Sequence, residues 1–257
     1  MTRHLAALVA LMLVNPLFAA EGDRRNFVAC PLVRDTKTVP CFLAESDGET
    51  YFLGIQQDIG AAFYPPQLLH EVLVEGTVAS GPRICGGIPL KPLKISVMPE
   101  INRACNTILP AEEGIDAPPA PRGAGPSTKR TNLGAPAAPP APPTAPFDRK
   151  DFTILFDFDS DYLMIPSTRV LQEAAVYAKA SSAAHVTVNG FRAATKLSNG
   201  RDLIENPSIA ERRAQKVMEI LRGLGLSALS MNAKPDAEQA DGIHDPQNRK
   251  VVIAVAP

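Results

Sequence analysis

The sequence predicts an α+β protein built from two folded units of different class. Its first half alternates short β-rich segments with glycine and proline turns, which is typical of a small barrel or sandwich. Its last part alternates strand and helix patterns, which favours helices packed on a mixed sheet. Between the two lies a stretch rich in proline and alanine that suits neither a helix nor a central strand.

These patterns divide the chain into four segments. We expect a signal peptide at 1–20, a small β-rich disulfide-bonded domain at 27–109, a Pro/Ala-rich linker at 111–146, and a second domain at 147–257. A length of 257 residues accommodates two such domains. The net charge of −1 provides no global basic field, so we expect no nucleic-acid partner.

The N-terminal residues have the pattern of a secretory signal. Basic Arg3 and His4 precede an unbroken apolar run, Leu5–Val14, and small residues follow at Ala19 and Ala20. Cleavage is expected after either alanine. The apolar run is too short to span a bilayer, so the mature chain should have no transmembrane span. A buried N-terminal helix is the alternative, but the run lacks a helical period.

All four cysteines lie in the first domain, at Cys30, Cys41, Cys85 and Cys105. An even number in an exported domain indicates two disulfides. Their spacing includes no C-x-x-C pair, which argues against a zinc site. Three connectivities are possible, and the shortest loops favour Cys30–Cys41 with Cys85–Cys105.

The linker should be a semi-stiff spacer. Its proline-dense part, Ala135–Pro146, favours an extended polyproline conformation, and the more polar Pro118–Arg130 should be looser. A proline-rich recognition motif is the alternative, and we consider it less favoured in an exported chain.

The first domain should be mostly β. Strand patterns occupy Glu49–Ile55, Val72–Val78 and Leu93–Met98. We predict a five-stranded barrel of the oligonucleotide/oligosaccharide-binding type. Gly76, inside a strand, indicates a bulge or a barrel bend. His70 has no histidine or cysteine partner nearby in sequence, so we expect it to be structural.

The second domain should have the order β-α-β-α-β-β, which is a two-layer sandwich with helices on one face of a mixed sheet. The expected elements are a strand at Phe152–Phe158, a helix from Ser167 or Thr168 to about Ala180, a strand at His185–Phe191, a helix from about Pro207 to Leu224, a strand at Leu229–Asn232, and a last strand at Arg249–Ala256.

The second helix has two candidate starts. Asn206 before Pro207 suits an N-cap followed by proline in the first turn. Ser208 and Glu211 have the spacing of a capping box. The sequence does not choose between them. With either start, helical spacing puts one apolar stripe toward the sheet: Ala210, Ala214, Val217, Leu221 and Leu224.

Four fragments of the second domain together carry a family resemblance. They are Phe156–Ser160 in the first strand, Gly190-Phe191 at the end of the second, Asn206–Ala214 at the helix start, and Asn248–Val251 before the last strand. In this order they resemble the peptidoglycan-associated domain at the C-terminus of OmpA-like proteins and Pal lipoproteins. The resemblance does not extend to the first domain.

The resemblance implies a binding site for the diaminopimelate residue of the peptidoglycan stem. In that family the second arginine of the helix start, here Arg213, faces a carboxylate of the ligand. The chemistry is sound, because a guanidinium binds a carboxylate through two parallel hydrogen bonds and a helix start favours an anion. In the competing interpretation, Arg213 pairs with Glu211 or Asp202 at the surface. Arg212 points elsewhere and should be solvated.

The family's aspartate, which faces the ligand ammonium, is not matched. Its expected position holds Ala193, and Arg192 before it adds positive charge. Asp202 or Glu205, later in the same loop, could supply a carboxylate. We therefore assign peptidoglycan binding to Arg213, Asn206 and Asp202, with helix capping as the other role of Asn206.

These observations predict a non-catalytic envelope protein of the periplasm or outer membrane. Its C-terminal domain would bind peptidoglycan and tether the N-terminal domain, which would meet another envelope protein. The alternative is an envelope scaffold that keeps the fold but has lost peptidoglycan binding, which Ala193 motivates. A hydrolase would need a nucleophile with a base, converging carboxylates or a metal. We find no such set, so we expect no catalytic residue, metal or cofactor; the histidines are scattered at His4, His70, His185 and His244.

Overall fold

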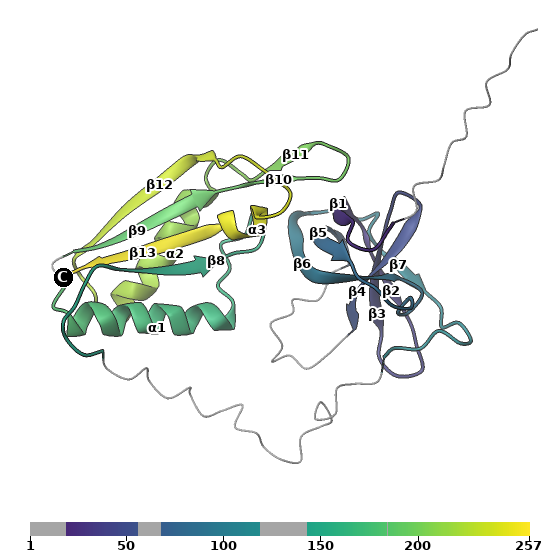
Figure 1. Cartoon of the computed structure of the whole chain (residues 1–257), viewed down its shortest axis with the longest axis horizontal. Helices are drawn as coiled ribbons and strands as arrows, with labels where there is room; N and C mark the ends of the chain where they lie inside the picture. The colour runs from purple at the N-terminus through teal and green to yellow at the C-terminus, as the bar shows by residue number, and fades with distance from the viewer. Residues whose placement is uncertain (1–18, 56–67, 119–142, 184) are drawn as a thin grey trace, which may run out of the picture.

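The computed structural model describes residues 19–55, 68–118, 143–183 and 185–257 (Figure 1). The predicted signal peptide lies almost wholly outside the described residues, as does the proline-dense part of the linker up to residue 142. Among those described, no helix combines the length and apolar character that crossing a membrane requires.

The N-terminal domain is a seven-stranded sheet with the order β1-β5-β6-β4-β3-β2-β7. Its strands are β1 (Arg24–Ala29), β2 (Pro31–Arg34), β3 (Cys41–Ser46), β4 (Glu49–Ile55), β5 (His70–Val78), β6 (Ile88–Ile101) and β7 (Thr107–Leu109). Only Cys30 separates β1 from β2. The strand order that starts at β1 therefore reaches, at β2, the segment that follows β1 in the chain. The strands pack around a core of Phe27, Phe42, Tyr51, Leu53, Val72 and Val74.

The three predicted strands lie within β4, β5 and β6, and the structure adds four more. The added strands are short, or are interrupted by charged residues and cysteines, so no alternating pattern marks them. At Gly76 the β5–β6 register shifts before Val78. A Cβ there would lie 3.0 Å from both the Leu90 Cβ and the Pro92 carbonyl oxygen, which explains the glycine at this bend.

All four cysteines form disulfides, but the favoured pairing is wrong. The bridges are Cys30–Cys105 and Cys41–Cys85, which span 75 and 44 residues. The preference for short loops considered only distance along the chain. The sheet instead places strands that are remote in sequence side by side, and this arrangement decides which sulfur atoms meet.

The C-terminal domain has two layers, with a mixed four-stranded sheet of order β12-β9-β13-β8. Its elements are β8 (Lys150–Leu155), α1 (Ile165–Ala180), β9 (His185–Arg192), β10 (Ala194–Lys196), β11 (Asp202–Ile204), α2 (Ile209–Gly223), β12 (Leu229–Ala237), α3 (Asp245–Asn248) and β13 (Lys250–Ala256). Helix α1 packs on β8 and β13, and α2 packs on β9 and β12. The shared core includes Phe152, Ile154, Leu171, Val188, Val217, Leu221 and Ile253.

Helix α1 begins before the residues that the sequence favoured, whereas α2 begins at the second of its two candidate starts, with Ser208 as the N-cap. Helix α1 starts at Ile165, because Pro166 is tolerated in a first turn, and Ser167 is buried inside that turn. Helix α2 follows Ser208, but the Ser208 side chain makes no capping hydrogen bond. The Asn206 side chain instead accepts the Ser208 amide at 3.0 Å, and so fixes the turn before the helix.

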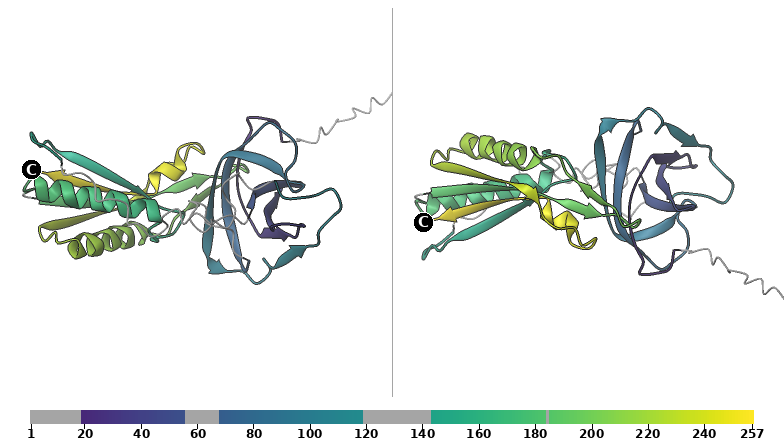
Figure 2. Two further views of the ribbon diagram at one scale, coloured as in Figure 1. Left: turned by 90° about the horizontal axis from the view of Figure 1, so that it is seen from below. Right: turned by 90° about the horizontal axis from the view of Figure 1, so that it is seen from above.

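The segment predicted as a polar loop contains a two-stranded hairpin, β10–β11. Thr195 is the middle residue of its first strand and pairs with Leu203, and Lys196 pairs with Asp202. Each strand has three residues, which is too short for a periodic signal. The hairpin leaves the end of the main sheet and reaches toward the N-terminal domain (Figures 1 and 2).

The two domains contact each other through this hairpin. Asn26 of β1 and Ser198 of the hairpin turn exchange two hydrogen bonds of 2.8 Å, from the Asn26 amide to the Ser198 Oγ and from the Ser198 amide to the Asn26 carbonyl. The Asn26 side chain, which is buried, donates to the carbonyls of Lys196 at 3.0 Å and Gly242 at 2.9 Å. Strand β1 and the hairpin are therefore joined by direct hydrogen bonds.

A buried ion pair also crosses the domain interface. Arg249 Nη2 donates to Glu75 Oε1 at 2.5 Å and to Thr195 Oγ1 at 2.6 Å, and both charged side chains are at most 2% exposed. The guanidinium lies 5.3 Å from the centre of the Phe158 ring. Nearby, the Phe158 amide donates to Ser96 Oγ at 2.9 Å. The domains are docked, whereas the linker had suggested that they stand apart.

Gly190, near the end of β9, permits the closest approach of sheet and helix. A Cβ at this position would lie 2.0 Å from the Ala210 carbonyl oxygen of α2. We therefore expect Gly190→Ala to lower the free energy of unfolding by about 1–3 kcal/mol, because the helix must move away. Urea unfolding followed by far-UV circular dichroism measures the change. Gly223→Ala, where an added Cβ meets nothing within 4 Å, is the control, and an equal loss in both variants would contradict this explanation.

Candidate functional site

Arg213 lies on the buried face of α2 and is fully buried. The helical spacing that turns Ile209 and Val217 toward the sheet turns this side chain inward too. Its guanidinium carbon lies 5.2 Å from the centre of the Phe156 ring. A charge inside a domain must be compensated by partners, and the surroundings of Arg213 provide them.

Every donor of the Arg213 guanidinium is used. A guanidinium carries five N–H groups. Nε donates to the Ser160 carbonyl at 2.9 Å, and the two Nη atoms donate to the carbonyls of Phe191 at 3.1 Å and Asp157 at 2.9 Å. The remaining two donors bind both carboxylate oxygens of Glu205, at 2.9 and 2.5 Å. No N–H of Arg213 remains for an external carboxylate.

The Glu205 carboxylate is equally saturated. Besides the two bonds from Arg213, Oε1 accepts the Asp159 amide and Oε2 accepts the Ala193 amide, each at 2.8 Å. A carboxylate has about four acceptor positions, and all are filled. Neither side chain of the pair is exposed. The pair is therefore bidentate and closed to solvent.

The hairpin places Glu205 opposite Arg213. Glu205 directly follows β11, and its amide donates to the Ala193 carbonyl at 3.1 Å just before β10 begins. Arg192 donates from Nε to the Glu205 carbonyl at 2.6 Å. Ala193, where the resemblance in the sequence led us to expect an acidic residue, contributes a backbone amide.

Asp159 contributes its amide from a left-handed backbone conformation, with φ at +52°. Aspartate tolerates this conformation better than most residues. Burial raises the pKa of the Asp159 carboxyl above its ordinary value, and the nearby Glu205 carboxylate raises it further. The Asn206 amide, which donates to Asp159 Oδ1 at 2.8 Å, opposes this shift.

The structure does not bring the three residues assigned to the site together as a group. Asp202 is exposed on β11 and pairs with Lys196 at 2.8 Å, so it does not face Arg213. Asn206 orders the start of α2 through its bonds to the Ser208 amide and hydroxyl. The carboxylate opposite Arg213 belongs to Glu205, the other loop residue that the sequence pointed to.

Arg212 lies apart from the closed pair. Its side chain is 42% exposed and pairs with Asp161 at 3.7 Å. It lines an open cleft of about 380 Å³ at the seam of the two domains, together with His70, Met98, Asp159, Asp161 and Tyr162. His70 is held there by a 2.8 Å hydrogen bond between its Nδ1 and the Met98 carbonyl. Neither Arg213 nor Glu205 lines this cleft.

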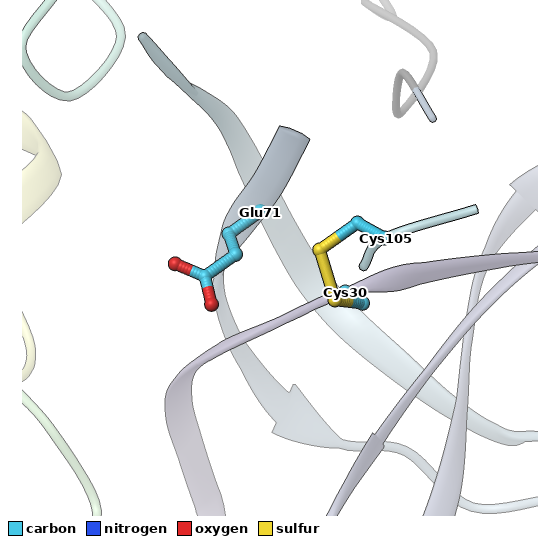
Figure 3. A group of neighbouring side chains, drawn as sticks. All are labelled: Cys30, Glu71 and Cys105. Carbon is cyan, nitrogen blue, oxygen red and sulfur yellow. A yellow bond between two sulfur atoms is a disulfide. The ribbon is translucent and has the colours of Figure 1, made fainter. Parts of the chain in front are cut away.

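A second cluster, in the N-terminal domain, has the residue types of a metal site. Glu71 lies beside Cys30 and Cys105 (Figure 3). The two sulfur atoms are joined in a disulfide, so they are not thiolate ligands. Glu71 Oε1 accepts a 3.3 Å hydrogen bond from Asn102. The cluster is a disulfide next to a carboxylate.

Comparison with known proteins adds structural similarities only. No family model matches the chain, and no curated protein matches it. The OmpA-like domain of FopA1 from Francisella tularensis subsp. tularensis SCHU S4 is 23% identical, covering 44% of this chain and 78% of that one, with a TM-score of 0.35. The peptidoglycan-associated lipoprotein from Burkholderia pseudomallei is 24% identical, with 40% and 88% covered and a TM-score of 0.32.

The periplasmic domain of Helicobacter pylori MotB (residues 78–256) is also similar. It is 23% identical, covering 40% of this chain and 69% of that one, with a TM-score of 0.33. Each of these three similarities covers less than half of this chain.

Proposed function

We propose that the protein is a non-catalytic cell-envelope scaffold of the periplasm or outer membrane. An OmpA-like domain carries a docked, disulfide-bonded β domain, and its carboxylate site is closed by its own Glu205. One observation carries this proposal: all five donors of Arg213 are used inside the domain, two of them by Glu205.

Energetics favour the closed site over binding of a peptide stem. An external carboxylate would have to displace Glu205, and an unpaired carboxylate inside the domain costs several kcal/mol. Glu205 is also part of the chain, so it competes at a high effective concentration. Binding of diaminopimelate at Arg213 is therefore disfavoured in the docked protein.

The N-terminal domain is proposed to be an OB-like barrel that meets another envelope protein. The strand order β1-β5-β6-β4-β3-β2 supports the barrel, since β1 and β2, at its two ends, are separated in the chain only by Cys30. Its disulfides suit an oxidising compartment outside the cytoplasm.

The second candidate function is peptidoglycan binding through Arg213, with the N-terminal domain tethered to the wall. The fragment Asn206–Ala214 favours it, because it matches the helix start that binds the stem in OmpA-like domains. For this function, Glu205 would have to leave the guanidinium.

Sedimentation with insoluble peptidoglycan tests the proposal. We expect the wild-type protein to stay in the supernatant, or to sediment by an amount that free meso-diaminopimelate does not reduce. The competition arm uses the wild type and so does not depend on how a variant folds. Sedimentation that diaminopimelate abolishes, and that Arg213→Lys loses while Arg212→Ala retains it, would establish the second candidate instead.

A further inference from the structure

We propose that the β10–β11 hairpin is an internal plug that the N-terminal domain holds in place. In this arrangement, docking of the two domains and access of an external carboxylate to Arg213 exclude each other. The inference rests on the proposed function, because it explains how the closed site is kept closed.

Glu205, at the end of the plug, occupies a carboxylate-binding site. We call the donors that surround its carboxylate the cradle. Two donors come from Arg213 and one from the Asp159 amide, and these belong to α2 and to the segment between β8 and α1. The fourth donor, the Ala193 amide, stands at the base of the hairpin together with Glu205 itself. If the hairpin moved away, three convergent donors would stay in the domain. Their chemistry suits the carboxylate of an amino acid or of a peptide side chain.

The same hairpin is fastened to the N-terminal domain at three points. In its first strand, Thr195 Oγ1 donates to Glu75 Oε1 at 3.3 Å, and Thr195 is fully buried. At the end of that strand, the Lys196 carbonyl accepts a 3.0 Å hydrogen bond from the Asn26 side chain, and at the turn Ser198 exchanges two bonds with the Asn26 backbone. Glu205 follows its second strand, so one short element joins the domain interface to the occupied cradle.

Coupling of this kind works in both directions. A partner that draws the barrel away from the hairpin frees Glu205 to leave, and exposes the cradle. A carboxylate ligand that takes the place of Glu205 releases the hairpin, and weakens docking by the same factor. The chain would then expose its ligand site only when its N-terminal domain is engaged elsewhere.

The test measures binding of free meso-diaminopimelate to the full chain by isothermal titration calorimetry. Asn26→Ala/Glu75→Ala removes barrel side chains that hold the hairpin and the interface and leaves the cradle unchanged. Glu45→Ala/Asn106→Ala changes the same residue types at exposed sites of the same domain. We expect the first variant to bind at least about ten-fold more tightly than the wild type, within the range of allosteric coupling, and the control to match the wild type.

Hydrogen exchange shows whether the hairpin has been released, through faster exchange across residues 193–205. A released hairpin without a gain in binding would overturn the inference. Glu205→Gln, which weakens the plug without changing its size, should also bind meso-diaminopimelate at least about ten-fold more tightly than the wild type. If the double variant does not fold, this single variant tests the inference. Tight, Arg213-dependent binding by the wild type would refute the proposed function. Equal, weak binding by all variants would refute only the coupling.

Discussion

Arg213→Ala is expected to lower the free energy of unfolding by about 3–5 kcal/mol, which is the usual cost of leaving one partner of a buried ion pair alone. The substitution strands the fully buried Glu205 carboxylate and removes the donors to the carbonyls of Asp157, Ser160 and Phe191. Urea unfolding followed by far-UV circular dichroism, with hydrogen exchange to separate the two domains, measures the loss.

The neighbouring arginine provides the control. Arg212→Ala removes an exposed side chain with a 3.7 Å ion pair, so it should change stability by at most about 1 kcal/mol. Arg213→Ala/Glu205→Ala should cost less than the sum of its single variants, with a coupling of about 0.5–3 kcal/mol. Additive losses would mean that the two side chains do not stabilise each other, and a stable Arg213→Ala protein would mean that the guanidinium is solvated.

Glu75→Ala should have a comparable effect, about 3–5 kcal/mol, but at the domain interface. It leaves Arg249 buried with no carboxylate partner, and among the described residues the Nε and Nη1 atoms of Arg249 already lack a hydrogen-bond partner. We expect the two domains, which should unfold together in the wild type, to unfold separately in the variant. Hydrogen exchange along a urea series measures this.

Glu45→Ala is the matched control for the interface, because Glu45 is an exposed glutamate of the same domain. It should change stability by no more than about 0.5 kcal/mol. If Glu75→Ala were as stable as this control and its domains still unfolded together, the docking would depend on the Asn26 contacts and not on the ion pair.

Local patterns predicted the elements that bury a repeating face. The strand predicted at Phe152–Phe158 ends at Leu155 in the structure, although Ile154, Phe156 and Phe158 are all buried, and the apolar spacing of the second helix predicted its buried face. The hairpin β10–β11 and the strands around Cys30 are too short to carry a period, so they were missed. The disulfide pairing was wrong because it depends on sheet order, which loop length does not encode.

The site could be predicted only in part. Helix periodicity places Arg213 on the same face as Ile209 and Val217, and this could have indicated a buried guanidinium. The backbone amides of Asp159 and Ala193 donate to Glu205, and any residue type can supply such a donor. The sequence therefore could not predict this role. The fragment Asn248–Val251 carries part of the family resemblance. Its Arg249 pairs with Glu75 of the other domain, and this pairing could not be predicted because it depends on how the domains dock.

The bridge between Cys30 and Cys105 has a mechanical consequence. Residues before Cys30 lead toward the start of the chain, and residues after Cys105 lead toward the proline-rich segment. A pulling force applied at these two ends passes through the covalent sulfur bridge and bypasses the residues between them. Strands β2, β3, β4, β5 and β6 lie wholly between the two cysteines, so they carry no tension along their own chain while the bridge is intact, whereas β1 and β7 lie outside it.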